Sequence, residues 1–163
     1  MYKPVMLFLF IAILMVLPAA YAEQALQVSN EPVEITADRL EANEALHSIV
    51  FIGNAEARQG DVTIYADRLT IFYQDKQNEI ERVMAQGNVR IVQFDRIATG
   101  EKAEFFRNEG RIVLSGQPRV SEGNSFVEGQ MITLFLNDKR SVVSGGDEGR
   151  VNAVFQPKTE SKP

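Results

Sequence analysis

The chain has 163 residues and a formal net charge of −5, with no cysteine and a single histidine. This length allows one ordinary domain, and the acidic balance excludes the basic arm that nucleic-acid binding requires, so we expect no nucleic acid as a partner. Without disulfide bonds, an exported form of the chain depends on its hydrophobic core for stability.

The first residues are typical of a cleavable secretory signal peptide. Lys3 supplies the positive start, the segment from Val5 to Leu17 is apolar throughout, and Ala20–Ala22 has the small-x-small pattern of a cleavage site. The apolar segment is shorter than the about 20 residues that a membrane span needs. We therefore expect residues 1–22 to be a signal peptide and to be removed, which we favour over a retained membrane anchor.

An internal repeat organises the rest of the chain. The hexamers at 35–40 (Ile-Thr-Ala-Asp-Arg-Leu) and 64–69 (Ile-Tyr-Ala-Asp-Arg-Leu) differ at one position. Their small residues start a series spaced by 29, 34 and 29 residues, and the glycines that follow apolar runs are spaced by 34, 29 and 29. The two series are Ala37, Ala66, Gly100, Gly129 and Gly53, Gly87, Gly116, Gly145. Both place an insertion in the second unit, and the polar segment 74–79 is the predicted loop that carries it.

Within each unit, apolar and polar residues alternate with a period of two, as in Val33–Ala37, Val62–Ala66 and Leu69–Tyr73. Such alternation predicts short β-strands with one buried face, and a slip of one residue would invert that face. Stacked units of this kind favour an all-β solenoid or a two-layer sandwich with a continuous inner face. We expect this domain to span residues 23–155 and the segment 156–163 to be a disordered tail.

The apolar residues of the inner face are the candidate ligand-binding residues. A groove open to a ligand and a filled, dry core are both compatible with the pattern, and the sequence does not decide between them. The candidates for the groove are Val33, Ile35, Leu40, Ile49, Phe51, Ile64, Leu69, Ile71, Tyr73, Ile91, Phe105, Leu114, Val127, Ile132 and Leu134.

The first and last strands are predicted to be open edges. Val33 and Ile35 mark the N-terminal edge, and Val151 and Val154 mark the C-terminal edge. Unpaired backbone groups on such strands can be completed by strands of other subunits, so we interpret both edges as partner-binding surfaces.

The polar residues form no recognisable catalytic or metal-binding pattern. His47 is predicted to lie in an exposed turn. Asp38 and Asp67 recur with the structural unit, which favours a turn-forming role over a catalytic carboxylate pair. The sequence contains no nucleophile elbow, P-loop or dinucleotide-binding fingerprint, so we expect no catalytic residue, no metal site and no cofactor.

An ordered set of motifs resembles the lipopolysaccharide transport protein A family (LptA, the OstA-like domain). The resemblance covers the whole chain after the signal peptide, and it departs from the family pattern at 100–103, where the repeat is degenerate. The matching segments are 31–38, 51–60, 64–69, 113–116, 123–129 and 150–157.

The resemblance implies a twisted β-jellyroll of two antiparallel sheets with open ends, located in the periplasm. It implies that the protein binds lipopolysaccharide, shields the acyl chains of lipid A in an apolar groove and bridges the inner and outer membranes. An LptC-like inner-membrane protein would bind the N-terminal edge and an LptD-like outer-membrane protein the C-terminal edge, with head-to-tail self-association between copies. The groove positions that it implies are Val33, Ile35, Phe51, Ile64 and Phe105.

Two other functions remain open at this point. One is an LptC-like adaptor or structural module of the envelope that uses the same edges and carries no lipid. The other is a lipid A-modifying hydrolase, for which the sequence provides no nucleophile–base set.

Overall fold

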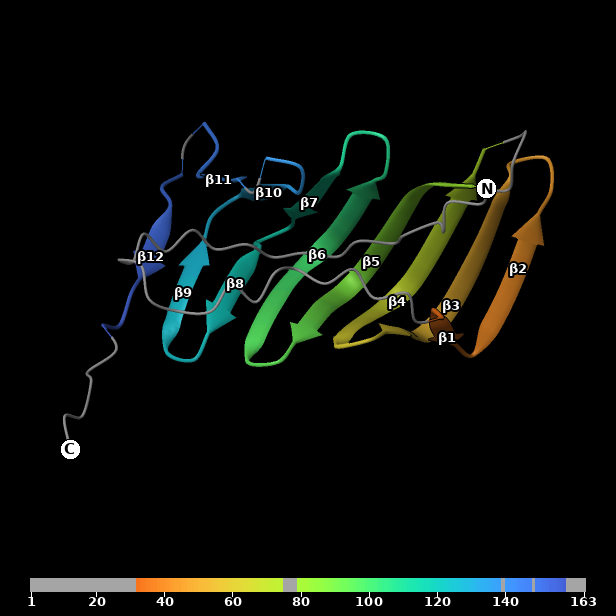
Figure 1. Cartoon of the computed structure of the whole chain (residues 1–163), viewed down its shortest axis with the longest axis horizontal. Helices are drawn as coiled ribbons and strands as arrows, with labels where there is room; N and C mark the ends of the chain where they lie inside the picture. Colours follow the sequence, from red (N-terminus) through yellow and green to blue (C-terminus); the bar gives the residue numbers. More distant parts are fainter. Residues whose placement is uncertain (1–31, 75–78, 139, 148, 158–163) are drawn as a thin grey trace.

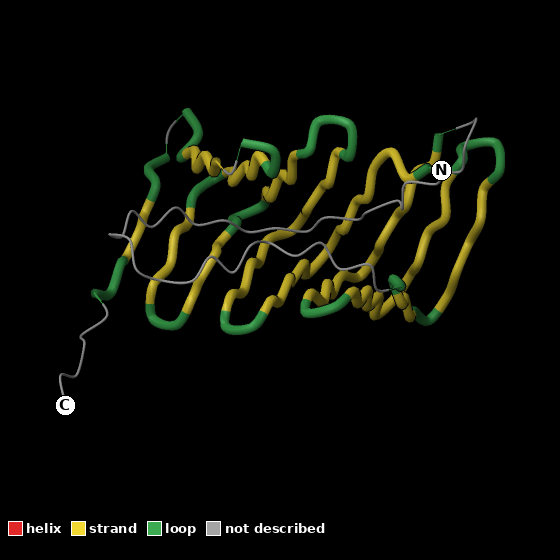
Figure 2. Tube along the Cα trace, viewed as in Figure 1, coloured by secondary structure: helices red, strands yellow, loops and turns green. Residues whose placement is uncertain are grey.

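The protein consists of β-strands and loops in the part of the chain that the structure describes (Figure 2). The computed structural model describes residues 32–74, 79–138, 140–147 and 149–157. The predicted signal peptide at 1–22 therefore lies outside the described residues. Within these ranges, no helix is long and apolar enough to cross a membrane.

Among the described residues, twelve strands form one hydrogen-bonded sheet in which every pairing is antiparallel. Alternating apolar residues produce these strands, because one face of each can then be buried. The strands are β1 (Glu34–Thr36), β2 (Arg39–Asn43), β3 (Ser48–Gln59), β4 (Val62–Tyr73), β5 (Ile80–Gln93), β6 (Arg96–Phe106), β7 (Arg111–Ser115), β8 (Arg119–Glu122), β9 (Ser125–Glu128), β10 (Met131–Phe135), β11 (Arg140–Ser144) and β12 (Asn152–Val154).

The four long strands β3 to β6 connect two layers of this sheet (Figure 1). In β6, the first half pairs with β8, whereas the second half pairs with β7. The upper layer contains β2, β7, β10, β11 and the segments 48–52, 68–73, 80–86 and 102–106. The lower layer contains β1, β8, β9, β12 and the segments 55–59, 62–65, 89–93 and 96–100.

This arrangement confirms the predicted twisted β-jellyroll with open ends. The two predicted sheets are the two layers of one continuous sheet, because β3 to β6 pass from one layer into the other. The predicted insertion loop at 74–79 connects β4 to β5, with the backbone N–H of Gln74 donating to the carbonyl of Glu79 over 2.9 Å.

Consecutive glycine and asparagine residues bend the long strands where these strands cross between the layers. The pairs Gly53–Asn54 and Gly87–Asn88 have φ angles of 80° and 45°, and of 77° and 49°. Glycine and asparagine tolerate this left-handed region better than other residues do. The ladder register shifts at the same places, which is the signature of a β-bulge and of increased twist.

An aspartate stands opposite each of these glycine–asparagine bends. Asn54 donates its side-chain N–H to Oδ2 of Asp38 over 2.9 Å, and Asn88 donates in the same way to Asp67 over 2.8 Å. Asp38 lies in the bend between β1 and β2, as predicted, whereas Asp67 lies within β4, so the prediction of a turn position is wrong for Asp67. The sequence repeat therefore records a repeated bend, in which a carboxylate on one strand holds the amide that follows the glycine on the next strand.

Small residues lie at the bends, and larger side chains fill the space between the layers. At the bend the layers are joined by small residues, such as Ala55 paired with Ala66, and a Cβ at Gly100 would lie 2.9 Å from the carbonyl oxygen of Ser115. Farther out, larger side chains such as Ile112 and Leu114 are 1% and 0% exposed. Burial of each of these side chains is worth about 1.5–3 kcal/mol. The side chains between the layers thus form the hydrophobic core.

Candidate functional site

The inner face of the upper layer is built from two rows of side chains, apolar except for Ser141 at the end of the second, that cross eight paired strands. Each row follows the strand register, so its members are neighbours on the same face. The first row is Leu40, Phe51, Leu69, Ala85, Ala103, Leu114, Ile132 and Val143. The second row is Ala42, Ile49, Ile71, Val83, Phe105, Ile112, Leu134 and Ser141.

The lower layer presents a third row to the same interior. It is made of Ile35, Ala57, Ile64, Ile91, Ala98, Val120, Val127 and Ala153. Buried members of all three rows belong to one hydrophobic cluster. Together the rows form a continuous apolar seam from one end of the molecule to the other.

Exposure divides this seam into a filled middle and open ends. Middle members such as Ile91 and Leu114 are at most 2% exposed, so their side chains fill the space between the layers. At the ends, Leu40 is 56% exposed, and Ala153 is also exposed. The end strands lack a neighbour on one side, which leaves one end of each row exposed, whereas the opposite ends at Ile35, Ser141 and Val143 are half-buried.

The structure places thirteen of the fifteen predicted groove residues in this seam and packs Tyr73 against the same core, and their burial differs with position. Val33 precedes β1 and is 37% exposed. The buried group is Leu69, Ile71, Ile91, Phe105, Leu114, Ile132 and Leu134. The half-buried group is Ile35, Ile49, Phe51, Ile64, Tyr73 and Val127, and Leu40 is exposed.

Some core residues of the seam were missed from the sequence. Ala98 is 0% exposed and Ala103 is 7% exposed. Ile97, the neighbour of Ala98, is more hydrophobic and lies on the outer face, which hides the alternation there. Counting back in twos from Gly100, the small residue of the third unit, would have selected Ala98.

Each end of the molecule offers two edge strands, one from each layer (Figure 1). At the N-terminal end these are β1, which contains the predicted Ile35, and β2. At the C-terminal end they are β12, which contains the predicted Val154, and β11. Val33 and Val151 lie just before β1 and β12. The sequence did not identify β2 and β11 as edges, although each is longer than the edge strand that was predicted.

The directions of these edges are suited to end-to-end pairing. In each layer the strands alternate in direction from one end to the other, so β2 and β11 run in opposite directions, as do β1 and β12. A second copy placed end to end would therefore continue the antiparallel ladder in both layers at once.

The outer face of the upper layer has a different chemistry, in which phenylalanine and arginine alternate across adjacent strands. Three guanidinium groups lie 4.1–4.3 Å from the centre of the neighbouring ring, in the stacked geometry of a cation–π contact. The row is Phe72, Arg82, Phe106, Arg111, Phe135 and Arg140. The arginines cover rings that would otherwise be open to water on this face.

A small cavity of about 340 Å³ lies beside this row at the ends of β4, β5 and β6. Phe72, Phe106 and Arg82 form part of its lining, together with the turn after β6. In that turn Arg111 donates a hydrogen bond to Glu109, and this bond lowers the pKa of the Glu109 carboxyl, with a smaller opposing effect of desolvation. The paired charges and covered rings identify a polar surface recess with no nucleophile.

In the described part of the chain, the titratable residues have structural roles. His47 is exposed in the turn between β2 and β3, as predicted, with φ 44°. Its carbonyl accepts the backbone N–H of Tyr73 over 2.9 Å. Among the described residues, no group of three histidine, aspartate or glutamate side chains is close enough together to hold a metal ion.

Comparison with known proteins gives one family. The model of LptA/(LptD N-terminal domain) LPS transport proteins matches residues 34–140, which is more than half of the chain. An uncharacterized protein of Rhizobium meliloti (strain 1021) is 30% identical over 102 residues, which cover 58% of this chain and 55% of that protein. The match thus spans about half the length of this curated relative.

A solved structure shares the fold. It is the crystal structure of LptH, the LptA homologous periplasmic component of the lipopolysaccharide transport device from Pseudomonas aeruginosa. It is 20% identical in sequence, and the match has a TM-score of 0.66 and covers 78% of this chain and 96% of that chain. The chain belongs to the LptA/(LptD N-terminal domain) family of LPS transport proteins.

Proposed function

We propose that this protein is a non-catalytic periplasmic carrier of lipopolysaccharide that helps to bridge the inner and outer membranes. One observation carries the proposal: three rows of largely apolar side chains run the full length of the molecule, and each end exposes some of them, Leu40 and Ala42 at one end and Ala153 at the other. An apolar seam with open ends can be continued by neighbouring subunits, which is what transport of a lipid across an aqueous compartment requires. Family membership supports the same conclusion.

The gain from shielding acyl chains is large enough to drive binding. Burial of a methylene is worth about 0.8 kcal/mol, so a chain of about twelve carbons gains about 10 kcal/mol before any cost is subtracted. Because the middle of the seam is filled, occupation there requires the layers to separate at the rim opposite the bend. The aspartate–asparagine contacts and the glycine bends hold the other side of the layers together.

We propose that partner proteins bind by adding strands at the two ends. An LptC-like inner-membrane protein would pair with β1 and β2, and an LptD-like outer-membrane protein would pair with β11 and β12. Copies of this chain would associate head to tail through the same edges. Several large exposed apolar side chains lie at these ends, including Leu40, Val142 and Val154, and such exposure marks interaction surfaces.

The proposed domain boundaries follow from the sequence. Residues 1–22 would direct export to the periplasm, 23–155 would form the jellyroll, and 156–163 would form the disordered tail, of which 158–163 lie outside the described residues. Gln156 is held against the β8–β9 turn, where its N–H donates to Ser125 Oγ over 3.0 Å.

The alternative is an LptC-like adaptor that pairs through the same edges without carrying lipid. Photo-crosslinking residues separate the two functions when they are placed on matched positions of opposite faces. We choose Phe51 against Val50 in β3 and Ile64 against Thr63 in β4, because all four are half-buried and each pair is adjacent in sequence. Lipopolysaccharide adducts should form at Phe51 and Ile64 and not at Val50 and Thr63. Equal labelling of both faces, or no labelling, would contradict the carrier function.

A further inference from the structure

The most exposed large apolar side chain of the described residues lies away from both ends of the molecule. Phe94 is 72% exposed in the turn between β5 and β6. The remaining large exposed apolar residues lie in or beside the terminal strands and the β2–β3 turn. They are Val33, Leu40, Leu46, Met131, Val142, Val151, Val154 and Phe155. The proposed end-to-end assembly accounts for those on the terminal strands, but it does not account for Phe94, because β5 and β6 lie midway along the sheet (Figure 1).

The backbone at Phe94 is strained for its residue type. Its φ is 52°, in the left-handed region, where a bulky side chain is disfavoured. Such strain in an exposed residue brings no packing within the chain, and strained residues of this kind concentrate at functional sites.

Two sister turns show what this position requires. Like Phe94, Gly60 in the β3–β4 turn and Gly123 in the β8–β9 turn are the first residues of two-residue turns at the rim of the lower layer. Their φ angles are 53° and 57°. The same chain thus uses glycine at two of three equivalent positions and phenylalanine at the third, although glycine fits all three.

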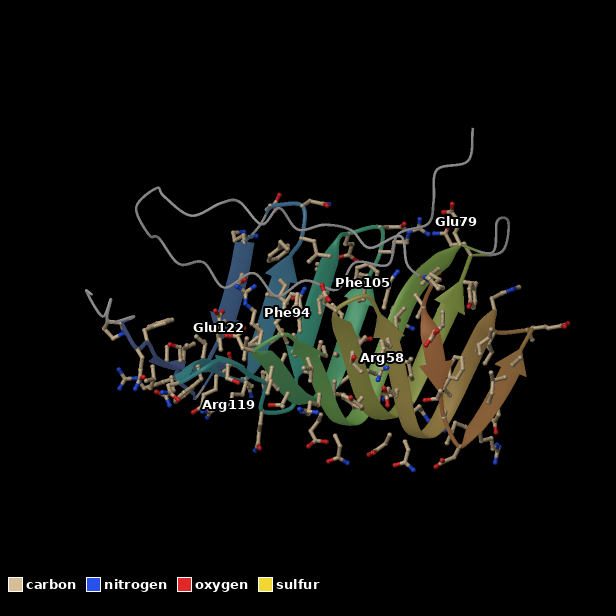
Figure 3. All side chains as sticks on the ribbon, turned by 60° about the horizontal axis from the view of Figure 1, so that its bottom comes forward. Arg58, Glu79, Phe94, Phe105, Arg119 and Glu122 are labelled. Atoms are coloured by element: carbon tan, nitrogen blue, oxygen red, sulfur yellow. The ribbon has the colours of Figure 1, made fainter. Side chains whose placement is uncertain are left out.

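The surroundings of the turn indicate the chemistry of the group that Phe94 contacts. The inner-face pair Ile91–Ala98 is buried, and the next pair outward, Gln93–Arg96, is half-buried at the rim. Arg96 is also ion-paired to Glu122 over 2.8 Å. Phe94 therefore stands just beyond a polar rim that borders the apolar seam. Figure 3 labels Phe94 at this rim and Phe105, which is 5% exposed, within the core.

Charge at the rim argues against a flat anionic membrane surface as the partner. Asp61 and Asp95 are exposed in two of the three turns, and carboxylates are repelled by anionic lipid headgroups. An alkyl chain that emerges from the seam past the rim has no charge and would reach the Phe94 ring from the inner side.

We propose that Phe94 is a lateral lipid-contact residue, which binds the alkyl part of the carried lipid at the rim of the lower layer. This inference rests on the proposed carrier function. The ring covers methylenes that leave the seam from the side, at a place that neighbouring subunits at the ends do not cover.

A single-tryptophan reporter tests the contact, because the chain contains no tryptophan. The variants F94W and F51W are titrated separately with purified lipopolysaccharide and with fully deacylated lipopolysaccharide. We expect both reporters to shift their emission to the blue with the acylated form only. A response of F51W without one of F94W would overturn the rim contact and leave the carrier function standing. Silence of both reporters contradicts the carrier function as well, and an equal response of F94W to both ligands assigns the contact to the polar head and overturns the proposal.

A substitution pair separates strain from binding. F94G gives this turn the residue of its sister turns, so its melting temperature should be unchanged or higher, while its affinity for lipopolysaccharide falls about tenfold through the lost burial of the ring. G123F introduces the same strain where a Cβ would meet nothing within 4 Å, so its melting temperature should fall while its affinity is kept. A lower melting temperature of F94G would show that the ring stabilises the fold. An unchanged affinity would show that the ring does not contact the lipid, and either result would overturn the proposal.

Discussion

Two almost identical hexamers of this protein lie in opposite environments, one at an end of the sheet and the other within it. The segment 35–40 lies at the N-terminal end, where it is divided between β1 and β2, whereas 64–69 lies within the uninterrupted strand β4. Leu40 is 56% exposed and its repeat equivalent Leu69 is 2% exposed. Both carry the same local signal, so the difference comes from the neighbours: β4 is paired on both sides, and the end strands on one side only. The same apolar pattern thus makes a core in one place and a contact surface in another.

The largest expected effect comes from truncating the two leucines. L69A removes a buried side chain and leaves a cavity, so we expect the free energy of unfolding to fall by about 3 kcal/mol. L40A removes a side chain that is mostly in water already, and its effect should stay within about 0.5 kcal/mol. Chemical denaturation of both variants measures the difference. Similar losses in the two variants would show that the N-terminal end is packed more tightly in solution than in this structure.

The bends should behave alike in both regions, because their local contacts are the same. A Cβ at Gly53 would lie 2.5 Å from Oδ2 of Asp38, and a Cβ at Gly87 would lie 2.3 Å from Oδ2 of Asp67. G53A and G87A should each lower the free energy of unfolding by about 2 kcal/mol, through the left-handed φ and the displaced carboxylate. The control G123A has the left-handed φ without the clash, so it should cost about 1 kcal/mol. An equal loss in the free energy of unfolding at all three glycines would show that the displaced carboxylate contributes nothing.

Charge placed on an end strand should affect assembly more than folding. L40K and V154K each put an ammonium group on an exposed position of an edge strand, where strand addition would bury it. Sedimentation velocity should show self-association weakened by about tenfold, which corresponds to about 1.4 kcal/mol, with an unchanged melting temperature. T63K on the outer face of β4 is the control and should associate normally. Ile35 is less suitable, because its half-buried side chain packs against the core. An effect of T63K as large as that of L40K would contradict pairing through the ends.

Much of the fold could be predicted from the sequence, because burial on one face leaves a period of two that is readable locally. The repeat of Asp38 with Gly53, and of Asp67 with Gly87, marks the units in the sequence. The crossing of β3 to β6 between layers could not be predicted, since it depends on which half of each strand pairs with which neighbour. β2 and β11 were missed as edges for the same reason: an edge is defined by an absent neighbour, and no residue within the strand encodes that absence.

The sequence predicts which strand face carries the candidate site, but it does not predict how deeply each side chain is buried. Alternation placed Phe51, Ile64 and Phe105 on one face, and the structure agrees. It gave no measure of exposure, so the half-buried Phe51 and the buried Phe105 had the same status. Phe94 carried no signal at all, because an aromatic residue before Asp95 does not indicate a left-handed turn; only the sister turns at Gly60 and Gly123 reveal the strain.

The smallest expected effect is a pH dependence from the turn after β6, and it shows how little surface charge contributes beside burial. The hydrogen bond from Arg111 lowers the pKa of Glu109 below its ordinary value of 4.5, and the carboxyl is exposed to solvent. Because the folded form binds this proton less readily than the unfolded chain, the ion pair stabilises the protein above 4.5 and loses that effect as the pH falls through the lowered pKa. The melting temperature of wild type should therefore exceed that of E109Q by a small amount at neutral pH, and the difference should vanish on the acid side of 4.5. A difference that persists in acid would mean that Glu109 acts through packing and not through its charge.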